Sequence, residues 1–300
     1  MKILAAVVTH NRRVLLARCL DALAAQTRAP DTVLVIDNAS SDGTTEMLAA
    51  RPVEVIRQDN LGSAGGWARA IEQALAGDYD AIWLMDDDGF PDAAALGLLE
   101  RALAPGVACA SSIVVREEDP ERFVFPFPLL DAHGDPVLLR WPRKLARRDQ
   151  LARHAPGGTY PFAHLFNGAL IDLATVRAVG NVNPAWFMFG DEVDFFFRLR
   201  ARGAVISVLA ALHRHPDVSA RPYSPIKVYY YVKNTLILNT RHMRQAWLRH
   251  GLAIGVVIAR VARRNGLGPA LSYVAGRNLP LLARAVARGL RGEIGKDFDG

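Results

Sequence analysis

The chain has 300 residues, of which 51% are hydrophobic and 22% are charged, and its formal net charge is +6. This length and composition indicate a globular protein of one large domain, alone or with a helical appendage, and exclude a disordered or fibrous chain. The charge is uneven, because residues 226–300 contain 13 Lys and Arg but only 3 Asp and Glu. The candidate partners of this basic segment are anionic lipid, nucleic acid or a phosphorylated acceptor, and no recognition motif supports nucleic acid.

No segment is suited to secretion or to crossing a membrane. The apolar stretch at residues 1–8 is too short for a signal peptide, and the longest apolar run, residues 251–259, is about half the length of a membrane span. Cys19 and Cys109 lie far apart and show no metal-type spacing. Such sparse cysteine favours a reduced, cytoplasmic setting over a disulfide framework.

Strand and helix patterns alternate four times in the first third of the chain. The expected strands are uniformly apolar, which indicates a mostly parallel sheet covered by helices on both faces, an α/β fold. The strands are predicted at residues 3–8, 32–36, 53–56 and 81–85. The helices are predicted at residues 13–26, after the capping residues 40–42 to about residue 50, after residue 66 to about residue 76, and after Pro91. A glycine-rich turn at residues 62–66 is expected to precede the third helix.

Polar residues follow each of these four strands. They are Thr9-His10-Asn11, Asp37-Asn38, Asn60 and Asp86-Asp87-Asp88. Ligands of such sheets bind outside the carboxyl ends of the strands. Because the carboxyl ends of parallel strands share one edge, we expect these residues to form a single site.

The second half of the chain is less regular. Residues 117–148 are predicted to be a long irregular segment, which is usually functional or disordered. A turn entering a strand is expected at residues 166–170, a helix at 191–202, a strand at 205–209 and helices from residue 226 onward. The sequence therefore predicts an α/β domain over residues 1–225 and a helical, basic segment over residues 226–300.

The aspartate run is the clearest candidate for metal chemistry. Three adjacent carboxylates repel one another and need a cation, and in an extended segment Asp86 and Asp88 point the same way. They are then placed to share a divalent ion such as Mg²⁺, which substrate phosphates complete. The alternative is a solvated acidic turn that caps the following helix.

Two further strand ends have both a binding and a local interpretation. Asp37 is placed to hydrogen-bond a nucleobase or ribose, but a carboxylate there also forms a simple turn or cap. The string Asn60–Gly66 matches neither a P-loop nor a dinucleotide fingerprint. It suits close approach of backbone to a diphosphate at a helix N-terminus, or is an ordinary turn.

An acidic pair and two histidines complete the candidates. Asp191 and Glu192 open a helix after the aromatic stretch 186–189. Acidic residues are favoured at a helix start by its dipole, whereas beside an apolar wall a carboxylate with a raised pKa suits a general base. His213 and His215 follow a predicted strand, and either structural roles or a nitrogen ligand for the metal fit them.

Taken in this order, several strings resemble the family 2 inverting glycosyltransferases of the GT-A fold, over roughly residues 3–235. The strings are Val7–Arg12, Val35–Thr44, Met85–Gly89, Gly190–Asp194 and His215-Pro216. Within that family the sequence is most similar to bacterial galactofuranosyltransferases, on Asn60–Trp67, Leu165–Leu170 and Gly190–Val193. Rhamnosyltransferases share much of the same pattern.

The resemblance implies a nucleotide-sugar donor, UDP-galactofuranose, and Mg²⁺ or Mn²⁺ held by Asp86, Asp88 and His215. It implies Glu192 as the base, at a position where the family usually has Asp, so Asp191 remains a second candidate. The implied donor-binding residues are Thr9, Asn11, Asp37, Asn60, Gly65, Gly66, Asp86 and Asp87. The implied acceptor contacts are Trp186, Phe187, Asn167 and Gly168.

The expected function is transfer of galactofuranose to a glycan or lipid-linked acceptor in cell-surface polysaccharide synthesis. Arginines around residues 251–259 predict a basic amphipathic helix at the inner face of the cytoplasmic membrane, or else a solvated helix packed on the catalytic domain. Three alternatives remain: a rhamnosyltransferase using dTDP-rhamnose, an inactive relative that binds nucleotide sugars, and a nucleotidyltransferase. The last lacks the expected glycine-rich basic signature near the N-terminus.

Overall fold

The computed structural model describes residues 1–218 and 221–298 and divides them into two compact units. The first unit comprises residues 1–182 and 195–217. The second comprises residues 183–194 and the described residues from Val218 onward. Each unit is built around its own hydrophobic core.

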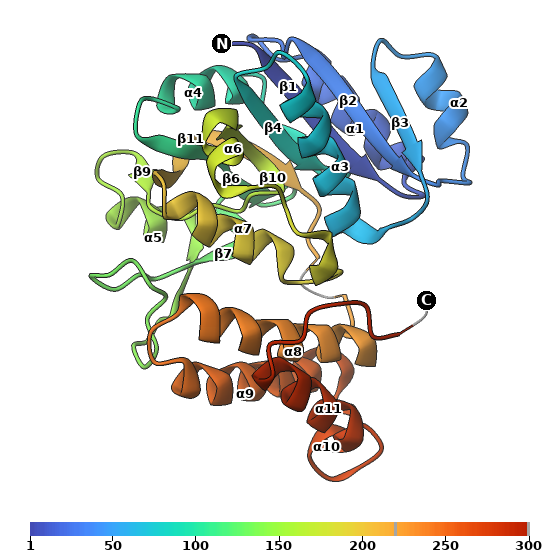
Figure 1. The fold of residues 1–300 in the computed structure, drawn as a ribbon. Helices are drawn as coiled ribbons and strands as arrows, with labels where there is room; N and C mark the ends of the chain where they lie inside the picture. Colours follow the sequence, from blue (N-terminus) through green and yellow to red (C-terminus); the bar gives the residue numbers. More distant parts are fainter. Residues whose placement is uncertain (219–220, 299–300) are drawn as a thin grey trace. The chain divides into compact units, whose positions relative to one another are not determined.

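The first unit is organised by a central sheet with the strand order β3-β2-β1-β4-β10-β6-β11-β5 (Figure 1). The first four strands along the chain are mutually parallel, whereas β10 runs antiparallel to both of its neighbours. The strands on this path are β1 (Ile3–Thr9), β2 (Thr32–Asn38), β3 (Glu54–Gln58), β4 (Ala81–Asp86), β5 (Phe90–Pro91), β6 (Val107–Arg116), β10 (Asn167–Asp172) and β11 (Ala204–His215).

Helices cover both faces of this sheet. Alternate residues of β1 enter different cores: Leu4 and Val8 pack with α3 and α6, whereas Ile3 and Val7 pack with α1 and α4. This alternation confirms the predicted α/β fold with a helical layer on each side. The helices are α1 (Arg13–Ala24), α2 (Thr44–Ala49), α3 (Gly62–Ala76), α4 (Ala95–Ala102), α5 (Arg148–Arg153), α6 (Leu173–Val179) and α7 (Asp191–Arg200). The start of α7, as far as Asp194, belongs to the second unit.

Three local expectations are wrong. The predicted glycine-rich turn is already helix, because α3 begins at Gly62, whose backbone N–H donates to Asn60 Oδ1 over 3.0 Å. The segment expected to be irregular contains β7 (Arg122–Pro128) and β8 (Lys144–Arg147), off the main path of the sheet. Because β7 contains two prolines, its sequence does not read as a strand, although strands away from the sheet centre tolerate proline. The strand predicted to end at residue 209 continues to His215.

The second unit is helical. Its elements are the 3₁₀ turn η1 (Pro184–Trp186) and the helices α8 (Pro225–His242), α9 (Ala246–Asn265), α10 (Leu267–Ala275) and α11 (Leu279–Leu290). Tyr229, Val257 and Tyr273 contribute to the common core of these helices. Among the described residues, none of the helices has the length and apolar character needed to cross a membrane.

Candidate functional site

The polar strand ends of the first unit meet at one edge of the sheet. In the β1–β2 pairing Thr9 lies opposite Asp37, and in the β1–β4 pairing Val8 lies opposite Asp86. The predicted convergence is therefore confirmed for three of the four strand ends, those of β1, β2 and β4. Since carboxylates from β2 and β4 flank β1 there, this edge concentrates negative charge.

The aspartate run forms a turn. β4 ends at Asp86, and the backbone N–H of Gly89 donates to the Asp86 carbonyl over 3.3 Å. The extended geometry expected for residues 86–88 is therefore wrong, and the next two carboxylates occupy the corner. Asp87 and Asp88 are only 4% and 3% exposed. Gly89 is required here, because a Cβ atom would lie 1.9 Å from His213 Nε2.

Arg12 compensates the two buried carboxylates. Its Nη1 lies 3.1 Å from Asp87 Oδ1 and 2.6 Å from Asp88 Oδ2, and the Thr9 hydroxyl donates to Asp87 Oδ2 over 2.7 Å. Burial raises the pKa of Asp87 despite Arg12. Burial alone would lower the pKa of Arg12, but the carboxylates outweigh it and raise that pKa.

Arg12 was not among the predicted site residues. It lies in the string at the end of the first strand, where a cation was already needed to balance the aspartate run. That charge requirement was the signal that would have found it.

His215 joins the same cluster from the end of β11. Its Nε2 lies 3.0 Å from Asp88 Oδ1, and its Nδ1 lies 2.6 Å from the carbonyl oxygen of Pro216. A carbonyl oxygen only accepts, so Nδ1 carries the hydrogen and Nε2 faces Asp88. Histidine ligands of metals are commonly oriented by such a bond from the second ring nitrogen.

The Asp88–His215 pair fits two positions of a metal shell. Neighbouring ligands of an octahedral ion bound at roughly 2.1 Å lie about 3 Å apart, which matches the Asp88–His215 separation. Within residues 1–218 and 221–298, no group of three or more His, Cys, Asp or Glu side chains is arranged to hold a metal ion. Two protein ligands suit Mg²⁺, which takes further oxygens from phosphates and water. Asp86, partly exposed at the end of β4, remains a predicted third ligand.

Asp37 and Asn11 shape the neighbouring strand ends. Asp37 is 1% exposed, and its carboxylate accepts from the Ser40 backbone N–H over 2.9 Å and from Arg57 Nη1 over 3.1 Å. Asn11 Oδ1 accepts from the Ser41 backbone N–H over 2.7 Å, which ties together the loops that follow β1 and β2. The turn interpretation of Asp37 is thus present in the structure. The donor-binding roles of both residues remain predictions.

The glycines of α3 have a packing explanation. A Cβ atom on Gly66 would lie 2.4 Å from Val8 Cγ1, and one on Gly65 would lie 2.4 Å from Leu61 Cβ. Gly66 therefore lets α3 approach β1 closely, and Gly65 leaves room for Leu61, the residue before the helix. The next residue, Trp67, stacks on Phe166 with ring centroids 4.6 Å apart. Donor binding by Gly65, Gly66 and Asn60 remains a prediction.

Asn167 and Gly168 start β10 beside a buried histidine. His213 is fully buried, and within the described part of the chain neither of its ring nitrogens has a hydrogen-bond partner. Burial, followed by the charge of His215, lowers the pKa of His213 to about 3. Gly168 has φ +87°, and a Cβ atom there would lie 2.9 Å from His213 Nδ1. His213 is therefore wedged between Gly89 and Gly168, while the acceptor roles of Asn167 and Gly168 remain predictions.

In the second unit, a strained aromatic loop precedes the acidic pair. Phe187 and Phe189 have φ values of 61° and 62°, in the left-handed region that side chains disfavour. Asn234 of α8 holds this loop, because its Nδ2 donates to the carbonyl oxygens of Trp186 over 3.2 Å and Met188 over 2.5 Å. Trp186 is fully buried against α8, which favours core packing over a sugar contact for its ring. Phe187 packs 5.1 Å from the Tyr230 ring.

The acidic pair begins α7. Asp191 is 4% exposed, and its Oδ2 is buried with no hydrogen-bond partner among the described residues. Burial raises the pKa of Asp191, and backbone N–H groups at the helix start oppose that effect. Glu192 is less buried than Asp191. A desolvated carboxylate next to a more accessible one provides groups suited to proton transfer.

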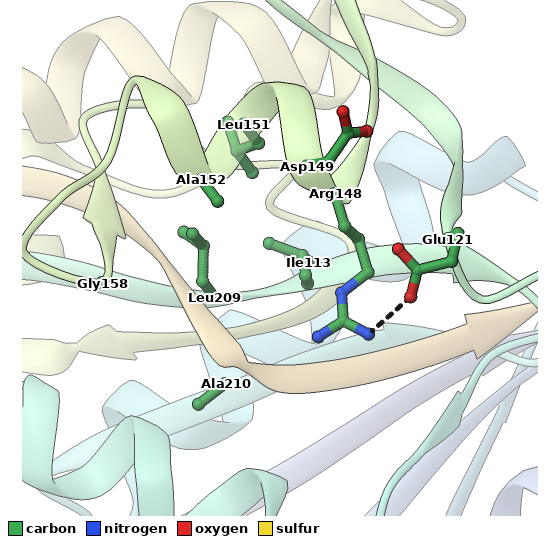
Figure 2. A pocket seen from close by; sticks show the side chains of 9 residues that line it. All are labelled: Ile113, Glu121, Arg148, Asp149, Leu151, Ala152, Gly158, Leu209 and Ala210. Carbon is green, nitrogen blue, oxygen red and sulfur yellow. Dashed lines mark hydrogen bonds and ion pairs between the residues drawn. The ribbon is translucent and has the colours of Figure 1, made fainter.

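A hollow of about 470 Å³ lies elsewhere in the first unit. Figure 2 shows apolar side chains around it, with Arg148 reaching to within 3.4 Å of Glu121. It is lined by Ile113, Glu121, Arg148, Asp149, Leu151, Ala152, Gly158, Leu209 and Ala210. None of the predicted site residues lines this hollow, so it is separate from the strand-end cluster.

The sequence matches the family described as Glycosyl transferase family 2 over residues 5–170. Galactofuranosyltransferase GlfT1 of Mycolicibacterium smegmatis is 39% identical over 219 residues, which cover 71% of this chain and 70% of the relative. Galactofuranosyltransferase GlfT1 of Mycobacterium tuberculosis is 34% identical over 282 residues, which cover 83% of this chain and 87% of the relative.

Solved structures show the fold at much lower identity. The mannosyltransferase PcManGT from Pyrobaculum calidifontis, in complex with GDP-Man and Mn²⁺, has a TM-score of 0.55 at 16% identity, covering 96% of this chain and 80% of that one. TarS residues 1–349 from S. aureus, in complex with UDP, has a TM-score of 0.56 at 11% identity, covering 97% and 81%. Their similarity supports the architecture alone.

Proposed function

The chain belongs to glycosyltransferase family 2, and from this premise we propose that it transfers galactofuranose from UDP-galactofuranose to a glycan or lipid-linked acceptor, with inversion. The observation that carries the donor assignment is the 39% identity to a galactofuranosyltransferase over 71% of the chain. The paired Asp88 and His215 support a metal-dependent reaction, because they provide a carboxylate and an imidazole at a two-ligand separation.

The strand-end cluster is proposed to bind the donor. Thr9, Asn11 and Asp37 contact the uridine, and Asn60, Gly65 and Gly66 line the approach of the diphosphate. Asp86, Asp88 and His215 hold Mg²⁺ or Mn²⁺, with Asp87 beside them. The bound ion supplies stabilisation of the negative charge that develops on the departing UDP. Arg12 contacts both Asp87 and Asp88 and holds their carboxylates in place while the donor binds.

The acidic pair is proposed to move the proton. Glu192 accepts the proton of an acceptor hydroxyl, whose oxygen then forms a bond to the anomeric carbon as the bond from that carbon to UDP breaks. A single displacement from the opposite face inverts the configuration. Asp191 is the alternative base, since burial raises the pKa of its carboxylate. Phe187, Asn167 and Gly168 are proposed to contact the acceptor, with Trp186 as a buried support.

The basic second unit supports a location at the inner face of the cytoplasmic membrane. A lipid-linked acceptor for cell-surface polysaccharide is presented there, and cationic segments are drawn to anionic lipid. We therefore propose a peripheral enzyme that meets its acceptor at the membrane surface.

The test is nucleotide release and glycosyl transfer by the purified protein across a panel of UDP- and dTDP-sugars, with Mn²⁺ or with EDTA. We expect UDP release from UDP-galactofuranose, abolished by EDTA and accelerated by a galactan acceptor. Release from dTDP-rhamnose alone would change the sugar and keep the mechanism. No release and no donor binding by calorimetry would identify a non-catalytic relative instead.

A further inference from the structure

Helix α10 exposes three large apolar side chains on one face. Leu267, Leu271 and Val274 are 73%, 64% and 55% exposed. Their spacing of four and three residues places them on the same side of a helix. Ala270 and Tyr273 of the same helix are buried in the core of the second unit. The three exposed residues, called here the α10 stripe, therefore do not serve the packing of that core.

The sequence around the stripe carries only positive charge. Between Asp217 and Glu293 there is no Asp or Glu, whereas 13 Lys and Arg occur there. Arg263 precedes α10 and Arg277 follows it, and both are exposed. The α10 stripe is thus flanked by cations at both ends of its helix.

The segment predicted from sequence to face a membrane is largely used for packing within the second unit. Within residues 251–259, Ala253 and Val257 are buried in the helical core, and Arg249 just before them is 9% exposed. That part of α9 therefore uses one face for folding. Trp247 at the start of α9 is 73% exposed, but within residues 251–259 no large apolar side chain is exposed, whereas α10 exposes three.

We propose that the α10 stripe and its flanking arginines dock on an anionic lipid bilayer. Apolar side chains of interfacial helices enter the boundary between headgroups and acyl chains, and arginines meet lipid phosphates at the surface. A nucleic acid would satisfy the charge but leave the stripe exposed. A second copy of the chain would cover the stripe but bring like charges together. Only an anionic lipid surface satisfies both features.

This inference deepens the proposed function, because it assigns the surface by which the enzyme reaches a membrane-bound acceptor. The experiment is vesicle flotation of the full chain with phosphatidylcholine vesicles that contain or lack phosphatidylglycerol. Leu271→Glu is compared with Leu290→Glu, which alters a 60% exposed leucine at the end of α11. The wild type is expected to float only with anionic vesicles, and less at high salt.

Leu271→Glu is expected to lower the fraction bound to vesicles about tenfold, because it removes one apolar anchor and adds a charge that the anionic lipid repels. Leu290→Glu is expected to retain binding. Circular dichroism checks that both variants fold. Equal flotation of Leu271→Glu and wild type would overturn the assignment. It would also be overturned if, in analytical ultracentrifugation without vesicles, the wild type is a dimer and Leu271→Glu is a monomer. UDP release from UDP-galactofuranose in solution needs no membrane. If the wild type releases no UDP in that assay, the proposed function fails, whatever the flotation result.

Discussion

The two acidic regions of the molecule differ in how their charges are balanced. At the strand ends of the first unit, Asp37 pairs with Arg57, Asp87 with Arg12, and Asp88 with both Arg12 and His215. At the start of α7 in the second unit, one carboxylate oxygen of Asp191 is buried with no hydrogen-bond partner among the described residues. The first arrangement holds charge in place, whereas the second favours a change of protonation.

The physical reason lies in desolvation. A buried carboxylate remains ionised when cations and hydrogen-bond donors compensate the loss of water, and such a group suits fixed binding of a metal or a diphosphate. Burial raises the pKa of Asp87 as well as that of Asp191. The two differ in their partners, because Arg12 and Thr9 hold Asp87, whereas a carboxylate oxygen of Asp191 has no partner within the described residues and is available to take up a proton. The comparison thus assigns donor binding to the strand ends and proton transfer to α7.

The largest effect is expected from the acidic pair. Glu192→Gln should reduce the turnover number by up to about 10⁴-fold, because an amide has no basic oxygen to take the acceptor proton. Single-turnover transfer from UDP-galactofuranose measures this loss. Asp191→Asn is the matched variant at the adjacent position. If Asp191→Asn causes the greater loss and removes the acidic limb of the pH–rate profile, the base is Asp191 and the assignment to Glu192 is wrong.

Removing a charge at the strand ends should have the next largest effect. Asp88→Asn leaves Arg12 and His215 without a shared carboxylate, and we expect the turnover number to fall by about 10² to 10³-fold at the Mn²⁺ concentration that saturates the wild type. Raising the Mn²⁺ concentration should recover part of the activity. Asp92→Asn, at an aspartate paired with Arg214 instead, is the control and should retain activity. Unchanged activity in Asp88→Asn would remove Asp88 from the metal site.

The first unit also contains a buried histidine, His164, whose hydrogen bond with the Phe125 carbonyl does not offset its burial, and it should control stability at low pH. Burial, with a smaller contribution from Lys144, lowers the pKa of His164 from 6.5 to about 4. Below pH 6.5 the unfolded chain binds a proton that the folded chain does not, so stability falls as the pH decreases from about 6.5 to 4. At pH 7 this penalty is absent.

His164→Gln should therefore reduce the loss of unfolding free energy between pH 7 and 4.5 by about 2 kcal/mol. Urea denaturation at the two pH values measures it. The exposed His154 provides a control, since His154→Gln should leave the pH dependence unchanged. An identical pH dependence in wild type and His164→Gln would contradict the burial argument.

The smallest effect tests whether the strained loop supports the acidic pair. Asn234→Ala removes the bonds to the Trp186 and Met188 carbonyls, so Phe187 and Phe189 lose the support for their left-handed backbone. We expect kcat to fall about tenfold, with the KM for the donor nearly unchanged. Asn239→Ala changes another buried asparagine of α8 and is the control. A matching loss in both variants would indicate general destabilisation of α8.

Much of the first unit follows from local sequence. Uniformly apolar strands fix a parallel sheet, and the residues after them must then share an edge, as Thr9 and Asp37 do. The order of the remaining strands depends on long-range pairing, and periodicity carries no signal for it. The sequence predicts too early an end for β11, because its last residues, His213, Arg214 and His215, have polar side chains that are typical of a loop.

The candidate site was less accessible to sequence reasoning. The turn at residues 86–89 depends on contacts with β11, because His213 occupies the space that a side chain at Gly89 would need. Arg12 becomes recognisable only when the strand ends are brought together. Similarly, α9 and α10 are both apolar in sequence, and only the packing of the second unit shows which of their faces is covered.

The division of roles between the two regions is tested most directly by calorimetric titration of UDP in the presence of Mn²⁺ into the wild type, Asp88→Asn and Glu192→Gln. We predict that Glu192→Gln binds UDP with the wild-type affinity, while Asp88→Asn binds at least about tenfold more weakly, equivalent to about 1.4 kcal/mol. Equal weakening in both variants, or undiminished binding in Asp88→Asn, would contradict the assignment of donor binding to the strand ends and proton transfer to α7.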